Sequence, residues 1–295
     1  MSRSKITFIS AMLIFGSIGL VSRNIRLSSA QIALTRGVIG SIFLLLASKV
    51  LKEKISWQKI RPNLPLLIIS GAGIGFNWIL LFEAYKYTSI ANATLSYYFA
   101  PVFVVLLSPF LLKERLTPIK VGCILAALGG MFLIVGIGGG EGKNHVIGIG
   151  YGLAAAVLYA GAIIVNKYMR GLSGLETTII QISAATAVLV PYILLTETIH
   201  IFLIDTRSAA YLIILGLIHT GLAYMLYFTG LKKLKAQTVA VLSYTDPISA
   251  ILMSALFLGE KLTLIQIFGG ILILGATLFS EAYDRKQGLQ SISDK

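Results

Sequence analysis

The sequence predicts an all-α membrane protein of ten transmembrane helices, built as two inverted five-helix repeats, and three observations support this class. Hydrophobic residues make up 56% of the chain and charged residues 13%, with a mean hydropathy of +0.86. Soluble proteins carry about 25% charged residues, and surface scaling would leave much of this apolar excess in water. The other two observations are a series of membrane-length apolar runs and an internal repeat.

Ten apolar runs divide the chain. Crossing about 30 Å of hydrocarbon takes roughly 20 helical residues. The runs of about this length lie at 5–22, 30–50, 63–86, 91–112, 118–138, 146–167, 175–196, 208–230, 237–258 and 262–282. The glycine-rich stretch Gly138–Gly142 is the one credible linker, and it lies near the middle. We therefore predict a first repeat at 1–140, a second, inverted repeat at 145–285, and a short cytoplasmic tail at 286–295.

The second half repeats landmarks of the first at a constant interval. The same number of residues separates Pro101 from Pro247 and Glu114 from Glu260. Each half holds five spans, and this odd number forces the second copy to enter the membrane in the opposite orientation, as in many secondary transporters. Further pairs at this interval are Tyr98 with Tyr244, Phe82 with Phe228, and Lys86 with Lys232.

The net charge of +13 fits a membrane surface rather than nucleic acid. Basic residues stand in short clusters between apolar runs, as in Lys232, Lys233 and Lys235. Such clusters follow the positive-inside rule and suit an anionic cytoplasmic leaflet, and they place both termini in the cytoplasm. We expect a multi-pass protein of a bacterial cell (plasma or inner) membrane. Its partners are the lipid bilayer and a small-molecule substrate, without nucleic acid, and its state is monomeric or homodimeric.

The sequence does not match the motifs of enzymes, cofactor sites or metal sites. Gly136–Lys143 is rich in glycine, but Ile137 and Asn144 stand where a phosphate-binding loop needs Gly and then Ser or Thr. Cys123 is the single cysteine, which excludes an internal disulfide and a cysteine-based metal framework. We therefore expect no enzyme activity, no cofactor and no metal, with energy supplied by a gradient or by exchange.

Two matched blocks carry a resemblance to a known family. They are Ala100-Pro101 with Lys113-Glu114-Arg115-Leu116-Thr117, and Asp246-Pro247 with Leu258-Gly259-Glu260-Lys261-Leu262-Thr263. With them the chain resembles the drug/metabolite transporter superfamily, in its ten-helix EamA-type branch, over nearly its whole length. The resemblance implies export or exchange of small metabolites through a central cavity between the halves, and it names no substrate. Ala100 departs from the pattern, because only the second block has an acid before its proline.

Asp246 is the leading candidate for substrate binding and for proton coupling. An ionisable side chain within a span costs roughly 2.5–3.5 kcal/mol on insertion scales, so its presence needs a reason. Pro247 lacks a backbone N–H, which predicts a helix break beside the carboxylate, and Pro101 predicts the matching break in the first half. A carboxylate beside freed carbonyls can bind a cation, a proton or an amine. The alternative is that Asp246 only caps this break.

Other charged residues of the spans have two interpretations each. Glu83 is a second proton-coupling candidate, but Lys86 stands at helical contact spacing and makes an outer salt bridge the alternative. Arg36 either extends to a headgroup or binds a substrate carboxylate at the cavity mouth. Glu114 and Glu260 recur at equivalent helix ends, which favours salt bridges or caps that fix the turns into the fifth and tenth spans.

Polar and aromatic side chains supply the remaining substrate-binding candidates. Asn77 and Trp78 lie in the third span, and His219 lies in its repeat-equivalent, the eighth. Their alternatives are a helix-joining amide, an interfacial anchor and a packing histidine. Tyrosines concentrate in the fourth, sixth, eighth and ninth spans, where they can form a wall that attracts a cationic ligand. The tyrosine candidates are Tyr97, Tyr98, Tyr159, Tyr224 and Tyr244.

These observations predict a secondary transporter that exports or exchanges small organic metabolites, such as amino acids or amines, by alternating access. Coupling to protons is left open. Transport of a lipid or lipid precursor on the same fold is the alternative, because the cavity walls look more apolar than charged. An intramembrane enzyme is a further alternative, and it lacks a convergent catalytic set.

Overall fold

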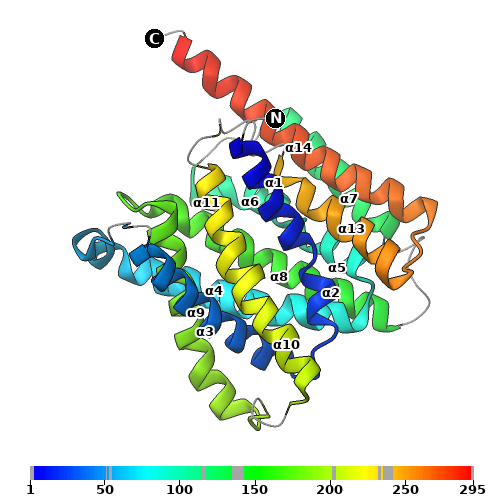
Figure 1. Ribbon diagram of the computed structural model, residues 1–295. Helices are drawn as coiled ribbons and strands as arrows, with labels where there is room; N and C mark the ends of the chain where they lie inside the picture. The colour runs from blue at the N-terminus through cyan, green and yellow to red at the C-terminus, as the bar shows by residue number, and fades with distance from the viewer. Residues whose placement is uncertain are drawn as a thin grey trace.

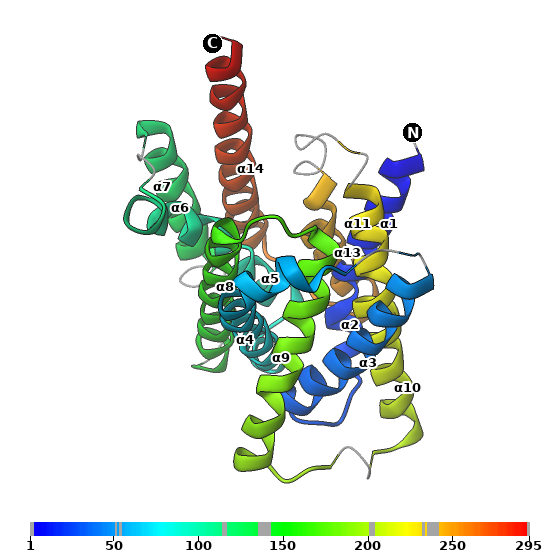
Figure 2. The same ribbon diagram turned by 90° about the vertical axis from the view of Figure 1, so that its left-hand side faces the viewer.

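The computed structural model describes residues 3–50, 52, 55–113, 117–134, 143–200, 204–231, 234 and 242–293. Every regular element within these residues is a helix, which confirms the all-α class. Figures 1 and 2 show one bundle, with the start of α1 and the end of α14 at the same end of the molecule. Gly138–Gly142 and Glu114 lie outside the described residues.

The helices follow the predicted order of apolar runs. Those of the first half are α1 (Arg3–Gly16), α2 (Ile18–Ser22), α3 (Ser29–Val50), α4 (Trp57–Tyr87), α5 (Ile90–Tyr97), α6 (Ala100–Leu111) and α7 (Pro118–Phe132). Those of the second half are α8 (Lys143–Tyr168), α9 (Gly174–Thr196), α10 (Thr206–Ile214), the π-helix η3 (Leu215–Leu222), α11 (Ala223–Leu231), α13 (Thr245–Leu258) and α14 (Leu264–Ser293).

Seven helical segments in the described residues are long and apolar enough to cross a membrane, and shorter apolar helices accompany them. The seven are Arg3–Ser22, Ser29–Val50, Trp57–Tyr87, Ile90–Leu111, Asn144–Tyr168, Gly174–Thr196 and Thr206–Gly230. The shorter ones are Pro118–Phe132, Thr245–Leu258 and Leu264–Ser280. The chain is therefore built as a multi-pass membrane protein.

Two helix ends differ from the sequence prediction. α4 begins at Trp57 rather than at 63, so that Pro62 lies inside the helix and not in a connection. A proline removes one backbone hydrogen bond, and here Asn63 supports the adjoining turn through bonds to the carbonyls of Lys59 and Arg170. α14 continues to Ser293, so the described part of the predicted tail extends the last helix (Figure 1).

Helices from the two halves interlock. α4 packs against both α8 and α9, α1 packs against α11 and α13, and α7 packs against α14. Glycines allow the closest approaches: a Cβ atom on Gly71 would lie 2.6 Å from the carbonyl oxygen of Gln181 in α9. A Cβ atom on Gly130 would lie 2.5 Å from the carbonyl oxygen of Gly269 in α14. Small residues of this kind let membrane helices pack backbone to backbone.

Candidate functional site

The interrupted helices of the two halves meet at Tyr98 and Asp246. α5 ends at Tyr97 and α6 begins at Ala100, so the break occupies the two residues that precede Ala100-Pro101. In the second half, Tyr244 precedes α13, and Asp246 lies in its first turn directly before Pro247. α5 and α13 are in contact, and the Tyr98 hydroxyl donates a hydrogen bond of 2.5 Å to Oδ2 of Asp246.

Further tyrosines lie near the pair formed by Tyr98 and Asp246. The ring of Tyr97 lies 5.8 Å from that of Tyr98 and 5.4 Å from that of Tyr159 on α8. Tyr97, Tyr159 and Tyr224 each interact electrostatically with Asp246. Among the described residues, no Lys or Arg pairs with Asp246 within ion-pair distance. The acid is therefore free to accept a proton or a cationic group.

Tyr159 is partly exposed but lies near other members of the tyrosine cluster. Its side chain is 39% exposed, which on its own would fit a lipid-facing position. It nevertheless interacts electrostatically with Tyr224 and Tyr227 of α11 and with Asp246 of α13. The residues that act on Tyr159 thus come from α11 and α13, whereas Tyr159 itself belongs to α8.

Arg36 is held deep inside the bundle. Its side chain is 3% exposed, so the interpretation that it extends to a headgroup is wrong. The guanidinium lies 4.3 Å from the ring centroid of Trp78 and 5.6 Å from that of Phe82, both on α4. Its Nε donates to Oγ1 of Thr220 in η3 at 3.1 Å. Trp78 is thus a buried platform for a cation and not an interfacial anchor.

The polar candidates His219 and Asn77 connect helices. Nε2 of His219 lies 2.9 Å from Oγ of Ser17, the residue between α1 and α2. Its Nδ1 lies 3.3 Å from the carbonyl oxygen of Ile214, a carbonyl that faces the wide π-turn. Asn77 donates from Nδ2 to the carbonyl of Ala155 at 2.6 Å, which joins α4 to α8. These contacts account for both side chains without a ligand.

The outer charges form two separate ion pairs. Oε1 of Glu83 lies 2.9 Å from Nζ of Lys86 in the last turns of α4. Oε1 of Glu260 lies 2.7 Å from Nη1 of Arg23 and accepts from the backbone N–H of Ile90 at 3.0 Å. Glu260 was expected to fix the turn into α14. Instead it caps the start of α5, because the chain folds back and brings the α13–α14 connection onto the first half.

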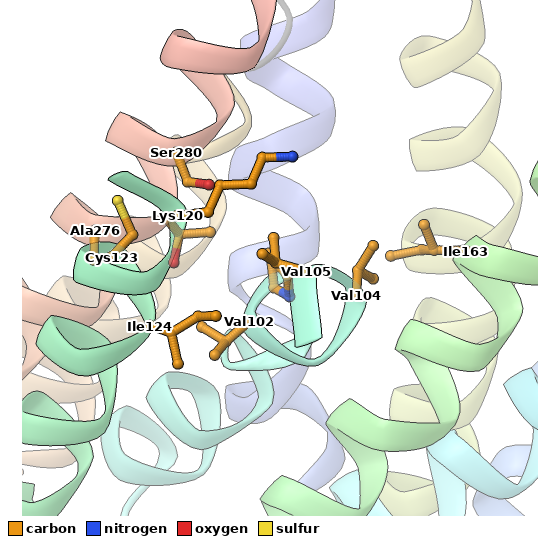
Figure 3. A pocket seen from close by; sticks show the side chains of 11 residues that line it. Val102, Val104, Val105, Lys120, Cys123, Ile124, Ile163, Ala276 and Ser280 are labelled. Atoms are coloured by element: carbon orange, nitrogen blue, oxygen red, sulfur yellow. The ribbon is translucent and has the colours of Figure 1, made fainter. Parts of the chain in front are cut away.

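A pocket lies between α6, α7, α8 and α14. Its volume of about 200 Å³ is below the range of roughly 300–1,000 Å³ typical of small-molecule sites. Figure 3 shows Lys120 and Ser280 at one end and Val104 and Ile163 toward α8. Most of the other lining residues are apolar, and neither Tyr98 nor Asp246 is among them.

No metal site is formed by the part of the chain that the structure describes. There, no group of three His, Cys, Asp or Glu side chains comes together in a way that could hold an ion. Around Tyr98 and Asp246 the described residues offer a carboxylate and several phenol groups, and Arg36 offers a guanidinium.

The fold and this interior define a class. A bundle of membrane-length helices that encloses a carboxyl group and a guanidinium cation, neither with an ion partner among the described residues, has the architecture of a membrane transport protein. The sequence model of the EamA-like transporter family matches residues 3–136 and again residues 146–281. The chain belongs to the EamA-like transporter family, which confirms the resemblance seen in the sequence.

Relatives from bacteria and archaea match most of this chain. An uncharacterized transporter of Bacillus subtilis, YxxF, is 31% identical over 99% of this chain and 93% of its own. An uncharacterized transporter of Archaeoglobus fulgidus is 29% identical over 75% of this chain and 77% of its own. Protein PecM of Dickeya dadantii is 26% identical over 83% and 80%. A solved crystal structure shares the fold, with a TM-score of 0.65 over 97% of this chain and 99% of the other, at 20% identity.

Proposed function

We propose that the chain is a secondary transporter of small organic metabolites that works by alternating access between two inverted five-helix repeats. Ten crossings follow if the seven long segments and the shorter apolar helices all span the bilayer. Two findings support this arrangement: the family model matches each half separately, and the chain ends lie at the same end of the bundle (Figures 1 and 2). An even number of crossings with cytoplasmic termini agrees with the distribution of basic residues.

The observation that carries the proposal is the hydrogen bond between Tyr98 and Asp246. Both residues stand at helix interruptions, where backbone groups are not used by the helix and can serve a ligand. They also come from different repeats, so rocking of one repeat against the other changes their separation. A substrate that binds here therefore binds the two halves together, which couples occupancy of the site to the conformational change.

Asp246 gives the site its selectivity for cationic groups and its route to coupling. A carboxylate without an ion partner can hold either a proton or a substrate ammonium, but not both at once. Exchange of one for the other across the membrane amounts to export of the substrate against entry of a proton. The phenol groups of Tyr97 and Tyr159 add rings that attract an ammonium by cation–π interaction.

The test is counterflow in proteoliposomes loaded with a mixed pool of amino acids, amines and nucleosides, with and without an imposed pH gradient. We expect uptake that follows the gradient in the wild type and loses its dependence on pH in Asp246→Asn. Asp205→Asn is the matched control, because Asp205 is an exposed helix cap far along the chain from the site. Normal, pH-dependent transport by Asp246→Asn would refute the role of this carboxylate.

Transport of a lipid is the second candidate, and the pocket beside α14 favours it. This pocket is largely apolar, with Lys120 at one end to meet a phosphate headgroup. Scrambling of a fluorescent phospholipid in the same vesicles distinguishes the two candidates. Lipid movement that depends on Lys120, together with no counterflow of any soluble compound, would replace the metabolite transporter by the lipid one.

A further inference from the structure

Arg36 is a buried cation that the described part of the protein does not neutralise. It stands in the middle of α3 and is 3% exposed, and no carboxylate there lies within ion-pair distance. A guanidinium keeps its charge in proteins, so this position has an electrostatic cost. Buried charges are normally paired or hydrogen-bonded, and the pairing group is missing from the chain's own side chains in this region.

The orientation of Arg36 is fixed on two sides. The Trp78 ring lies against the guanidinium at 4.3 Å, and Oγ1 of Thr220 accepts from Nε at 3.1 Å. Thr220 is itself held, because its hydroxyl donates to the carbonyl of Leu215 across the π-turn at 3.1 Å. With Nε and one face occupied, the terminal amino groups are the part of the fork left to recognise another molecule.

Three tyrosines are near enough to interact with both Arg36 and Asp246. Tyr85, Tyr97 and Tyr224 each interact electrostatically with both charged groups. The cation and the acid therefore share the same tyrosine neighbours but are too far apart to form an ion pair with each other. A ligand with one negative and one positive group, separated by a few atoms, is complementary to this arrangement.

The chemistry at Arg36 favours a carboxylate over a phosphate. A planar carboxylate accepts two parallel hydrogen bonds from one guanidinium and needs no second cation. A phosphate monoester carries close to two negative charges, which a single arginine neutralises only in part. The negative Asp246, which interacts with the same tyrosines, adds repulsion against a dianion.

We propose that Arg36 is the binding site for a substrate carboxylate, so that the transported compounds are small zwitterions whose ammonium group lies toward Asp246 and Tyr98. This inference rests on the proposed transport function and specifies its substrate class. A further prediction is that amines without a carboxylate, and acids without an amine, are poor substrates.

The experiment compares matched compounds in the counterflow assay. Each amino acid of the pool is tested beside its amide, which keeps the ammonium group and the size but removes the carboxylate charge. We expect the wild type to prefer the acid over the amide by about tenfold or more, as the loss of a charge-assisted bond predicts. Arg36→Gln removes this preference, and Arg36→Lys retains part of it. The matched control is Arg207→Gln, because Arg207 also lies over a ring, that of Tyr211, but on the outer surface.

The outcomes separate the two proposals. Equal transport of acid and amide by the wild type would overturn the role of Arg36 and leave the transporter in place. This comparison needs no variant, so it holds even where Arg36→Gln fails to fold. No counterflow of any amino acid, amine or nucleoside would instead overturn the metabolite transporter itself, and with it the carboxylate site.

Discussion

The hydroxyl of Tyr98 and the carboxylate of Asp246 join the two helix interruptions of the chain across 2.5 Å. Tyr98 belongs to the first half and Asp246 to the second, and the fold brings them into contact. The bond ties α5 of the first half to α13 of the second at the level where both helices are broken. A movement of one half relative to the other must therefore break this hydrogen bond, unless α5 and α13 move together.

Tyr98→Phe tests the contact without removing the ring. We expect counterflow to fall by about tenfold, because a hydrogen bond to a charged acceptor is worth roughly 1.5–3 kcal/mol and its loss leaves the acid without this donor. Tyr87→Phe is the control, since Tyr87 stacks on Tyr151 at the outer end of α4. Unchanged transport by Tyr98→Phe would show that the contact does not serve the transport cycle.

Glu260→Gln and Glu83→Gln compare two ion pairs of different burial. Glu260 is 12% exposed, pairs with Arg23 and caps α5, so we expect its change to lower the free energy of unfolding by about 1–3 kcal/mol. Glu83 is 26% exposed and pairs with Lys86 on one helix face, so we expect at most about 0.5 kcal/mol. Thermal melting in detergent measures both. Equal effects would contradict the assignment of Glu260 as a cap.

Gly130→Ala tests the contact between α7 and α14. The new methyl group would lie 2.5 Å from the carbonyl oxygen of Gly269, so we expect a loss of about 1–3 kcal/mol in stability. Gly129→Ala is a control at the adjacent position, where a Cβ atom meets nothing within 4 Å. Alanine there should be neutral or stabilising by up to about 1 kcal/mol, because alanine favours the helix. If both variants melted at the same temperature, the close contact between α7 and α14 at Gly130 would be contradicted.

Asp205 gives stability a dependence on pH outside the spans. The backbone N–H of Ser208 donates to its carboxylate and holds the pKa of Asp205 below its usual value. A lowered pKa contributes stability above the pKa of the unfolded chain, and this contribution disappears as the pH falls through the pKa of the folded protein. We expect the difference in melting temperature between the wild type and Asp205→Asn to shrink on acidification below about pH 4. A constant difference would contradict the cap.

The sequence predicts the all-α class and the order of the apolar helices, which the structure confirms, and it points to Asp246 as a candidate site residue. Asp246 can be identified from the sequence because placing a carboxylate inside an apolar run has a high free-energy cost. The proline after it predicts a helix break. The predicted start of α4 and end of α14 are wrong, because the sequence pattern places helix boundaries at proline and at charged residues. In the structure, Asn63 supports the proline-containing turns of α4.

The environment of Arg36 could not be predicted from one sequence. Its position inside an apolar run was the available signal, but its interpretation depends on Trp78 and Thr220, which are distant along the chain. Glu83 posed the opposite difficulty, because its depth in the span and its spacing to Lys86 fitted different roles. In both cases the role of the side chain depends on which residue lies next to it on another turn or helix. A hydropathy profile does not contain this information.

The π-helix η3 also constrains how this chain can change in length. A π-turn holds more residues than the α-turn on either side, and successive α-helical residues are rotated by about 100°. Deleting one residue between Leu215 and Leu222 would convert the wide turn to an α-turn and rotate everything that follows by about that angle. Tyr224 would then no longer meet Phe15, whose ring now lies 5.1 Å away. The number of residues in this turn thus determines which side of α11 faces the interior.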